Sequence, residues 1–209
     1  MDRALFESPS KLLGVARAAA ANGADIVQLR NKIDTPRQVT EMARAIKEIT
    51  RLRGVKLIIN DRPDIALASG ADGVHVGQED LPLFWARAIL GKERIVGVST
   101  HSLKEAKEAE QQGADYIGLG AIFATPTKPE VRPIGMRLIA KVLKEVRIPV
   151  VAIGGINRDN VTNILDAASG MSTKFGVAVV RAVCKAEDPS AATRQLKELI
   201  VNRSEALAV

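Results

Sequence analysis

Short apolar runs and amphipathic segments alternate along most of this chain. Seven apolar runs have the length of buried β-strands, and they lie at residues 25–29, 55–59, 73–76, 95–98, 116–119, 149–153 and 176–180. Helical patterns lie at residues 9–22, 36–52, 62–70, 81–90, 103–112, 135–146, 159–168 and 189–201. Because strands and helices alternate, the chain is predicted to form a parallel β-sheet flanked by helices.

The βα units repeat one local motif, which strengthens this prediction. Gly-Ala-Asp closes a helix and leads into the next strand at residues 23–25, 70–72 and 113–115. A series of seven such units predicts an α/β fold of the (β/α)8 TIM barrel type. A helix rather than a strand comes first, so we expect the first strand to be missing or truncated. No low-complexity linker interrupts the chain, and a single domain over residues 1–209 is expected.

The amino-acid composition argues against a nucleic-acid-binding protein. The net charge is +6, but the 30 basic residues are scattered among 24 acidic ones and only six side chains are Phe, Trp or Tyr. A nucleic-acid surface would show basic clusters with stacking aromatics, so no nucleic-acid partner is expected. A modest positive balance suits a protein whose ligands are small polyanions.

The cysteine count and the apolar runs bear on the compartment. Cys184 is the only cysteine, which excludes an internal disulfide framework and fits a reducing cytoplasm. No apolar run reaches the ~18 residues that a membrane helix needs, and the N-terminus does not have the layout of a secretory signal. We therefore expect a soluble, cytoplasmic protein without a membrane partner.

Two acidic residues mark the ends of two consecutive predicted strands. Asn60-Asp61 ends the second apolar run, and Asp80 follows the third run in the segment 73–80. Carboxylate oxygens without Cys or clustered His suit Mg²⁺, which takes one or two protein carboxylates and bridges to substrate phosphates. Asp61 and Asp80 are therefore candidate Mg²⁺ ligands, and the pair suggests phosphate or pyrophosphate chemistry.

Polar side chains also follow other predicted strands. Gln28, Arg30 and Lys32 alternate along an extended segment, so they point to one side and can grip a polyphosphate. The alternative is a strand end with solvated basic residues. Ser99 and His101 follow the fourth run, and His75 lies within the third; for either histidine a structural role competes with acid–base chemistry.

Two later segments have features of phosphate sites. Thr125, Pro126, Thr127 and Lys128 begin a long loop that is either a rigid turn or a lid carrying a cation. Gly154-Gly155 lies between a strand and a helix, where backbone N–H groups can bind phosphate. A Gly-Gly turn is a weak signal by itself, but it is the expected phosphate site near the last strands of a barrel.

The strand-end motifs together strongly resemble thiamine-phosphate synthase, in order over residues 24–190. The segments that carry the resemblance are Val-Gln-Leu-Arg-Asn-Lys, Ile-Asn-Asp-Arg-Pro-Asp, Gly-Val-His-Val-Gly-Gln-Glu-Asp, Gly-Val-Ser-Thr-His-Ser, Ala-Asp-Tyr-Ile-Gly-Leu-Gly, Thr-Pro-Thr-Lys-Pro and Val-Ala-Ile-Gly-Gly-Ile-Asn. The family's fold is a (β/α)8 barrel, in agreement with the periodicity.

The resemblance implies a transferase of thiamine biosynthesis. It would join 4-amino-2-methyl-5-hydroxymethylpyrimidine diphosphate to hydroxyethylthiazole phosphate by a dissociative, Mg²⁺-dependent reaction that gives thiamine phosphate and pyrophosphate. Mg²⁺ would lie on Asp61 and Asp80, and Arg30, Ser99 and Lys128 would be catalytic. The implied substrate-binding residues are Gln28, Leu29, Arg30, Asn31, Lys32, Asn60, Ser99, Thr125, Pro126, Thr127, Lys128, Gly155, Val180 and Arg181. Association with further copies of the chain stays open.

Three features depart from the family pattern. Residues 1–3 match only the tail of its first strand motif, so that strand is expected to be absent and its neighbour's edge unpaired. Residues 169–175 lengthen a connection that is usually short. Arg181 stands where the family usually has Ser, and it either adds a cation for phosphate or blocks the site.

Three other functions compete with the synthase. A thiazole tautomerase shares the fold but has no diphosphate or metal to hold, so Asp61, Asp80 and Lys128 favour the synthase. A non-catalytic protein that binds thiamine precursors is the second alternative. A generic phosphate-binding isomerase is the third, and it is disfavoured because its chemistry does not require the paired aspartates.

Overall fold

The computed structural model of the protein describes residues 1–127 and 131–206, with side chains up to residue 203. Over these residues the chain has seven β-strands, ordered along the sheet as they occur in the chain. The chain divides into two compact units: residues 1–96 with 180–197, and residues 97–179 with the residues from 198 onward. That the whole chain is one domain stays a prediction.

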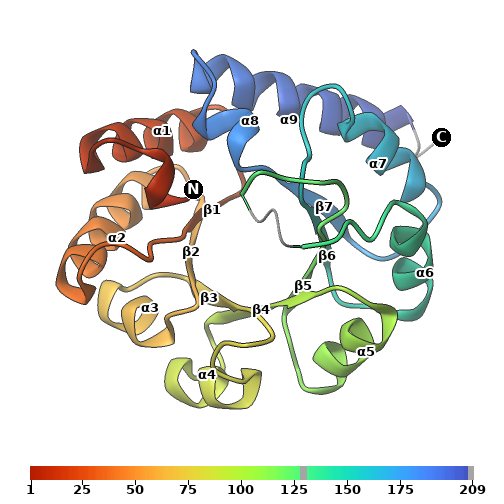
Figure 1. Cartoon of the computed structure of the whole chain (residues 1–209), viewed down its shortest axis with the longest axis horizontal. Coiled ribbons are helices and arrows are strands. Elements are labelled where there is room, and N and C mark those ends of the chain that lie inside the picture. Colours follow the sequence, from red (N-terminus) through yellow and green to blue (C-terminus); the bar gives the residue numbers. More distant parts are fainter. Residues whose placement is uncertain (128–130, 207–209) are drawn as a thin grey trace. The chain divides into compact units, whose positions relative to one another are not determined.

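The first unit contains three parallel strands together with helices from both ends of the chain (Figure 1). The strands are β1 (Ile26–Leu29), β2 (Lys56–Asn60) and β3 (Gly73–Val76). The helices are η1 (Arg3–Leu5), α1 (Pro9–Ala21), α2 (Pro36–Arg51), α3 (Pro63–Ser69), α4 (Leu83–Leu90), α8 (Arg181–Cys184) and the first part of α9 (Pro189–Ala206). Pro at the first turn starts α1, α2 and α3, where its missing N–H costs no helical hydrogen bond.

The expected loss of the first strand is confirmed in a modified form. Residues 1–3 lie beside β1, where Asp2 and Arg30 form a parallel bridge. The Arg30 N–H donates to the Met1 carbonyl at 2.9 Å, and the Arg3 N–H donates to the Arg30 carbonyl at 2.8 Å. The first strand is thus truncated to a bridge, and the end of β1 has a partner where we expected an unpaired edge.

The second unit contains most of β4 (Ile95–Thr100) and three further parallel strands, β5 (Tyr116–Leu119), β6 (Val150–Ile153) and β7 (Phe175–Ala178). Its helices are α5 (Leu103–Gln111), α6 (Arg137–Glu145), α7 (Val161–Ala167) and the end of α9. The lengthened connection at 169–175 packs on α6, because the Thr173 hydroxyl donates to the carbonyls of Leu143 and Val146 at 3.2 and 2.8 Å.

Strands of the first unit separate an apolar face from a more polar one. Alternate residues of β1, β2 and β3 are almost completely buried: Val27, Leu29, Leu57, Ile59, Val74 and Val76. The intervening positions include Gln28, Asn60 and His75 as well as the fully buried Ile58, and Asn60 is in register with His75. Residues in register on parallel strands project to the same side. The polar side chains therefore share one face, toward the carboxyl ends of the strands.

Candidate active site

Asp61 and Asp80, the predicted metal ligands, interact directly in the first unit. Asp61 follows β2 with φ +65°, and its N–H donates to the His75 carbonyl at 2.7 Å. Asp80 follows β3 and is oriented by the Gly77 N–H, which donates to its Oδ2 at 2.7 Å. A Cβ atom on residue 77 would lie 2.9 Å from that oxygen, so Gly77 leaves room for the contact.

The surroundings of Asp61 make its negative charge costly. Burial of the carboxyl group and its hydrogen bond to the Asp80 side chain raise the pKa of Asp61 above its ordinary value. Lys32 acts in the opposite direction, since its Nζ lies 2.9 Å from Asp61 Oδ2. Two facing carboxyl groups with one ammonium group nearby form an environment that favours a further cation.

The donor set around this pair fits Mg²⁺ better than a metal that needs many protein ligands. No cluster of three or more His, Cys, Asp or Glu side chains suited to a metal occurs in residues 1–127 and 131–203. Mg²⁺ commonly takes one or two carboxylates and completes its shell with waters and substrate phosphates. Asp61 and Asp80 could therefore hold Mg²⁺ together with a phosphorylated ligand.

Arg30 is held in place by a residue that we did not identify from the sequence as part of the site. Its Nη1 lies 2.5 Å from Oδ2 of Asp2, which is only 6% exposed. The other Asp2 oxygen accepts the Ala4 N–H at 3.0 Å, so the carboxylate is fixed from both sides. Asp2 is far from Arg30 in sequence, and no local pattern links the two.

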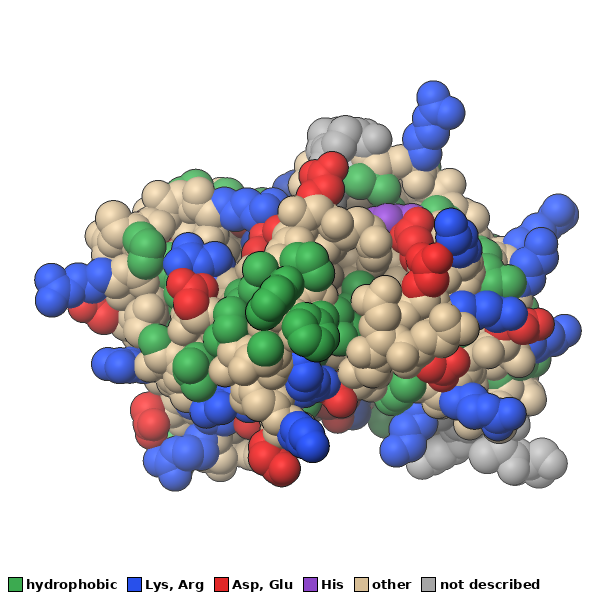
Figure 2. All heavy atoms as spheres, turned by 90° about the horizontal axis from the view of Figure 1, so that it is seen from below, with side chains coloured by type: hydrophobic (Ala, Val, Ile, Leu, Met, Phe, Trp, Pro, Cys, Tyr) green, Lys and Arg blue, Asp and Glu red, His purple; other side chains and the backbone are tan. Residues whose placement is uncertain are grey.

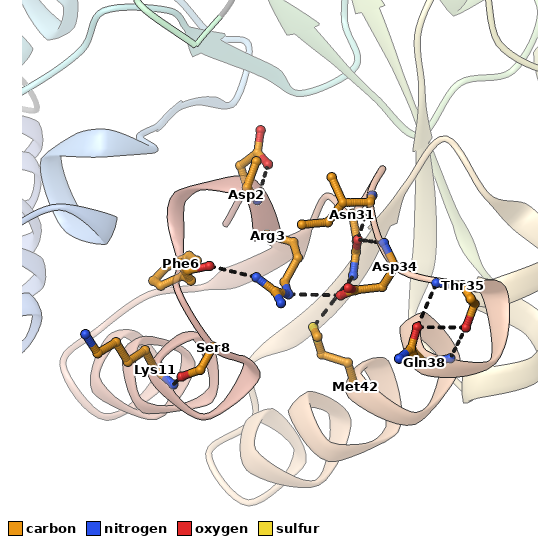
Figure 3. A network of polar contacts seen from close by, with 12 residues as sticks. Asp2, Arg3, Phe6, Ser8, Lys11, Asn31, Asp34, Thr35, Gln38 and Met42 are labelled. Carbon is orange, nitrogen blue, oxygen red and sulfur yellow. Dashed lines mark hydrogen bonds and ion pairs between the residues drawn. The ribbon is translucent and has the colours of Figure 1, made fainter.

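A neighbouring network occupies the side chain of Asn31, another predicted binding residue (Figure 3). Its Oδ1 accepts the N–H groups of Ile33 and Asp34 at 3.2 and 3.1 Å, and its Nδ2 donates to Asp34 Oδ2 at 2.9 Å. Arg3 donates to the same Asp34 oxygen at 2.9 Å. Asn31 therefore shapes the turn after β1, while Leu29, at 1% exposure, can offer a ligand only its backbone.

Thr125 and Thr127 lie in the second unit, in a segment that packs against the Gly154-Gly155 turn. The Phe123 N–H donates to the Gly154 carbonyl at 3.1 Å, just before these threonines. The two glycines have φ values of +104° and +66°. A Cβ atom on Gly155 would lie 2.6 Å from the Ala124 carbonyl oxygen, so only glycine fits this approach.

The hydroxyl groups of the two threonines differ in their partners. Thr125 Oγ1 accepts the Thr127 N–H at 3.3 Å. Thr127 Oγ1 is buried and has no hydrogen-bond partner among the described residues. A buried hydroxyl without a partner is uncommon, because the lost hydration is not replaced. It is therefore available to a ligand. Pro126 lies exposed between the threonines.

The structure indicates less about the roles of the remaining predicted site residues. Ser99 is half-buried on β4, in register with Gly118. Val180 precedes α8 and Arg181 begins it with an exposed side chain, so Arg181 is open to solvent in its own unit. Lys128 lies outside the described residues, and its proposed catalytic role stays a prediction. His101 Nδ1 contacts the Gly120 carbonyl oxygen, which supports a structural role for that ring.

A matching family model and two curated relatives indicate one family for this chain. A profile described as thiamine monophosphate synthase matches residues 2–183. The thiamine-phosphate synthase of Chloroflexus aurantiacus is 48% identical over 187 residues, covering 89% of this chain and 84% of that protein. That of Moorella thermoacetica is 47% identical over 189 residues, covering 90% and 88%.

A solved structure supports the fold as well. The thiamine phosphate pyrophosphorylase of Pyrococcus furiosus has a TM-score of 0.87 to this chain and 37% sequence identity, covering 97% of this chain and 94% of that one. The predicted α/β class of TIM barrel type, with the first strand truncated, is confirmed by this similarity. None of the described helices is both long and apolar enough to cross a membrane.

Proposed function

We propose that this chain, which belongs to the thiamine monophosphate synthase family and is a transferase (EC 2.5.1.3), joins 4-amino-2-methyl-5-hydroxymethylpyrimidine diphosphate to hydroxyethylthiazole phosphate. The products are thiamine phosphate and pyrophosphate. The observation that carries this proposal is the pairing of Asp61 with Asp80 beside Lys32, because a diphosphate held with a divalent cation requires both acids and cations. Residence in the cytoplasm is part of the same proposal.

Asp61 and Asp80 would hold Mg²⁺ in this protein. When bound, Mg²⁺ neutralises charge that develops on the departing pyrophosphate. The chain supplies the rest of the neutralisation through Arg30 and Lys32, which are anchored by Asp2 and Asp61. These anchors keep the cations in position before substrate arrives, so little reorganisation is needed during the reaction.

The bond that breaks joins the pyrimidine methylene carbon to a diphosphate oxygen. Pyrophosphate leaves with the electron pair, and the thiazole nitrogen donates its lone pair to the resulting pyrimidine cation. No protein nucleophile takes part. Gln28 and Asn60 lie on the polar strand face of the first unit and would orient the diphosphate substrate by hydrogen bonds. The substrate contacts of Ser99 and Lys128 rest on the resemblance alone.

The thiazole phosphate would be bound by residues of the second unit. Thr127 offers a buried hydroxyl group, and the Gly154-Gly155 turn brings backbone close to the segment that carries Thr125. Backbone N–H groups at glycine turns suit phosphate because they approach it without steric hindrance. Arg181 belongs to the first unit, where its side chain is exposed, and its proposed role as an added cation for phosphate rests on the resemblance alone.

Measuring pyrophosphate and thiamine phosphate together tests this proposal. Purified protein receives both phosphorylated precursors and Mg²⁺, and matched reactions omit one precursor or contain a chelator instead of the metal. We expect the two products in equal amounts, and only in the complete reaction. Pyrophosphate released without the thiazole phosphate would indicate a hydrolase, and no release from folded protein that binds both precursors would indicate a binding protein.

A further inference from the structure

Helix α4 is apolar on both of its faces. Its buried residues are Leu83, Ala86 and Leu90. On the outward side, Phe84, Trp85 and Ile89 are 68%, 57% and 40% exposed. Arg87 is the only charged residue of the helix, and its guanidinium group folds back onto the Gly91 and Arg94 carbonyls at the end of the helix. A helix that is apolar all round is usually buried all round, so the exposed side of α4 lacks the cover that its sequence predicts.

The exposed apolar side chains form one surface, which we call the α4 patch. It consists of Leu81, Phe84, Trp85, Ala88 and Ile89. Figure 2 shows hydrophobic side chains gathered on this side of the molecule, with acidic and basic side chains around them. With an exposed aromatic side chain contributing on the order of 100–150 Å², the patch exposes on the order of 400 Å². The largest apolar patch of a monomeric protein is commonly of this size and is often functional.

The α4 patch has two large aromatic side chains beside a small one. Phe84 and Trp85 pack edge to face, with ring centroids 5.1 Å apart and planes at 77°, so the two rings form a fixed aromatic projection. Ala88 lies one helical turn further on and carries only a methyl group. An antiparallel second α4 could place its rings over Ala88, and the reverse contact would form at the same time.

We propose that the α4 patch binds a second copy of this chain in a two-fold symmetric dimer. Charges of both signs lie on the elements next to the patch, with Arg62 and Asp64 at the start of α3, which contacts α4, and Lys92 and Glu93 directly after α4. An acidic partner would be attracted only by the basic residues of this set, and a basic partner only by the acidic ones. A two-fold axis instead lets each copy offer both signs to the other.

The area available agrees with a dimer of moderate stability. Two patches of on the order of 400 Å² each, with the polar groups around them, approach the ~1,200 Å² of total buried surface typical of small specific interfaces. Exposed Trp and Phe side chains at the centre are the type of residue that contributes most to such interfaces.

The experiment combines molecular mass with the fluorescence of Trp85, the only tryptophan of the chain. Light scattering during size exclusion is run over a range of protein concentration for the wild type and for Phe84→Glu. The matched control is Leu52→Glu, the same type of change at a residue that is 73% exposed and outside the α4 patch. Circular dichroism establishes that both variants are folded.

We expect the wild type and Leu52→Glu to approach twice the monomer mass as concentration rises, while the Trp85 emission shifts to shorter wavelength. Phe84→Glu should stay monomeric, with emission at the longer wavelength of an exposed indole. A wild type that stays monomeric throughout would overturn the proposal. So would a dimer that persists in Phe84→Glu, or one in which the Trp85 emission does not shift, because the interface would then lie elsewhere.

Discussion

Asp61 is specialised in its backbone as well as in its carboxyl group. Its φ of +65° lies in the left-handed region, which asparagine and aspartate adopt more readily than other residues with a side chain. An Asp61→Ala change would remove the carboxyl group and also strain the turn by about 1–2 kcal/mol. Asp61→Asn keeps the side-chain shape and tolerates the conformation, so it is the cleaner test of the charge.

Asp61→Asn should make the metal-free protein more stable at neutral pH. The folded-state pKa of Asp61 is raised, so the carboxyl group favours folding below its unfolded pKa and loses that contribution as pH rises through the folded pKa. At pH 7 the ionised group is therefore a net cost, which the neutral amide removes. In the ion pair between Lys32 and Asp61, the Lys32 side chain is 56% exposed. Loss of this ion pair should therefore lower the stability by less than removal of the buried charge raises it.

Urea unfolding in a chelator measures this effect. The variant should exceed the wild type in free energy of unfolding at pH 7, and the difference should disappear near pH 3, where the wild-type carboxyl group is protonated. Mg²⁺ at 100 times its Kd should stabilise the wild type by about 2.7 kcal/mol and the variant much less. A variant less stable than the wild type at pH 7 and equally stabilised by Mg²⁺ would contradict this account of Asp61.

The sequence identified Asp61 and Asp80 as a pair, but it could not identify what fixes Arg30. The acid pair follows from strand ends, because the carboxyl ends of parallel strands are adjacent. The contact between Arg30 and Asp2 joins residues that are distant in sequence, and it depends on the truncated first strand lying beside β1. Likewise, nothing in the sequence indicated that the Thr127 hydroxyl is buried with no partner among the residues that the structure describes.

At the scale of elements, the turn after β6 determines where the Thr125 segment can lie. Gly155 allows the Ala124 carbonyl to approach closely, and the Gly154 carbonyl accepts the Phe123 N–H at 3.1 Å. The Asn160 amide group adds a hydrogen bond to the Gly155 carbonyl at 3.0 Å. The turn and the segment before Thr125 therefore form one packed layer.

Gly155→Ala should disturb this layer and weaken binding of the thiazole phosphate. The added Cβ atom would lie 2.6 Å from backbone that cannot move independently, so we expect a loss of about 2–4 kcal/mol in stability from strain and overpacking together. The KM for the thiazole phosphate should rise more than the KM for the pyrimidine diphosphate.

Gly170→Ala is the matched control for this change. Gly170 also has a left-handed φ, +72°, but a Cβ atom there meets open space. This control should cost only the conformational term of about 1–2 kcal/mol and leave both KM values unchanged. Thermal unfolding measures the stability of both variants, and initial-rate kinetics measure their two KM values. Equal losses in the two variants would show that the close packing at Gly155 is unimportant.

Most elements could be predicted from the sequence, and the exceptions have local causes. The predicted strand at residues 73–76 is observed as β3 without change, because Gly-Ala-Asp before it and polar residues after it limit the apolar run. The strand predicted at residues 176–180 is observed at Phe175–Ala178. There β7 ends at Ala178, because the following residues turn into the four-residue helix α8, which is too short to produce a helical period.

At the scale of the whole molecule, the polar residues collect at the carboxyl ends of strands, and the truncated first strand leaves this pattern intact. Asp61, Asp80 and Arg30 belong to the first unit, where residues 1–3 lie beside β1 and contact it through a bridge and an ion pair. The proposed substrates, metal and dissociative reaction depend most on the two aspartates.

Mg²⁺ dependence of thiamine phosphate formation therefore tests whether Asp61 and Asp80 hold the metal that the proposed reaction needs. It compares the wild type with Asp80→Asn and with Asp64→Asn, a control that removes an exposed carboxylate paired with Arg62. We expect saturable activation by Mg²⁺ in the wild type and the control, and a loss of about 10²–10³-fold in Asp80→Asn at equal Mg²⁺. Full activity in a chelator, or an Asp80→Asn variant with the wild-type Mg²⁺ response, would contradict the account.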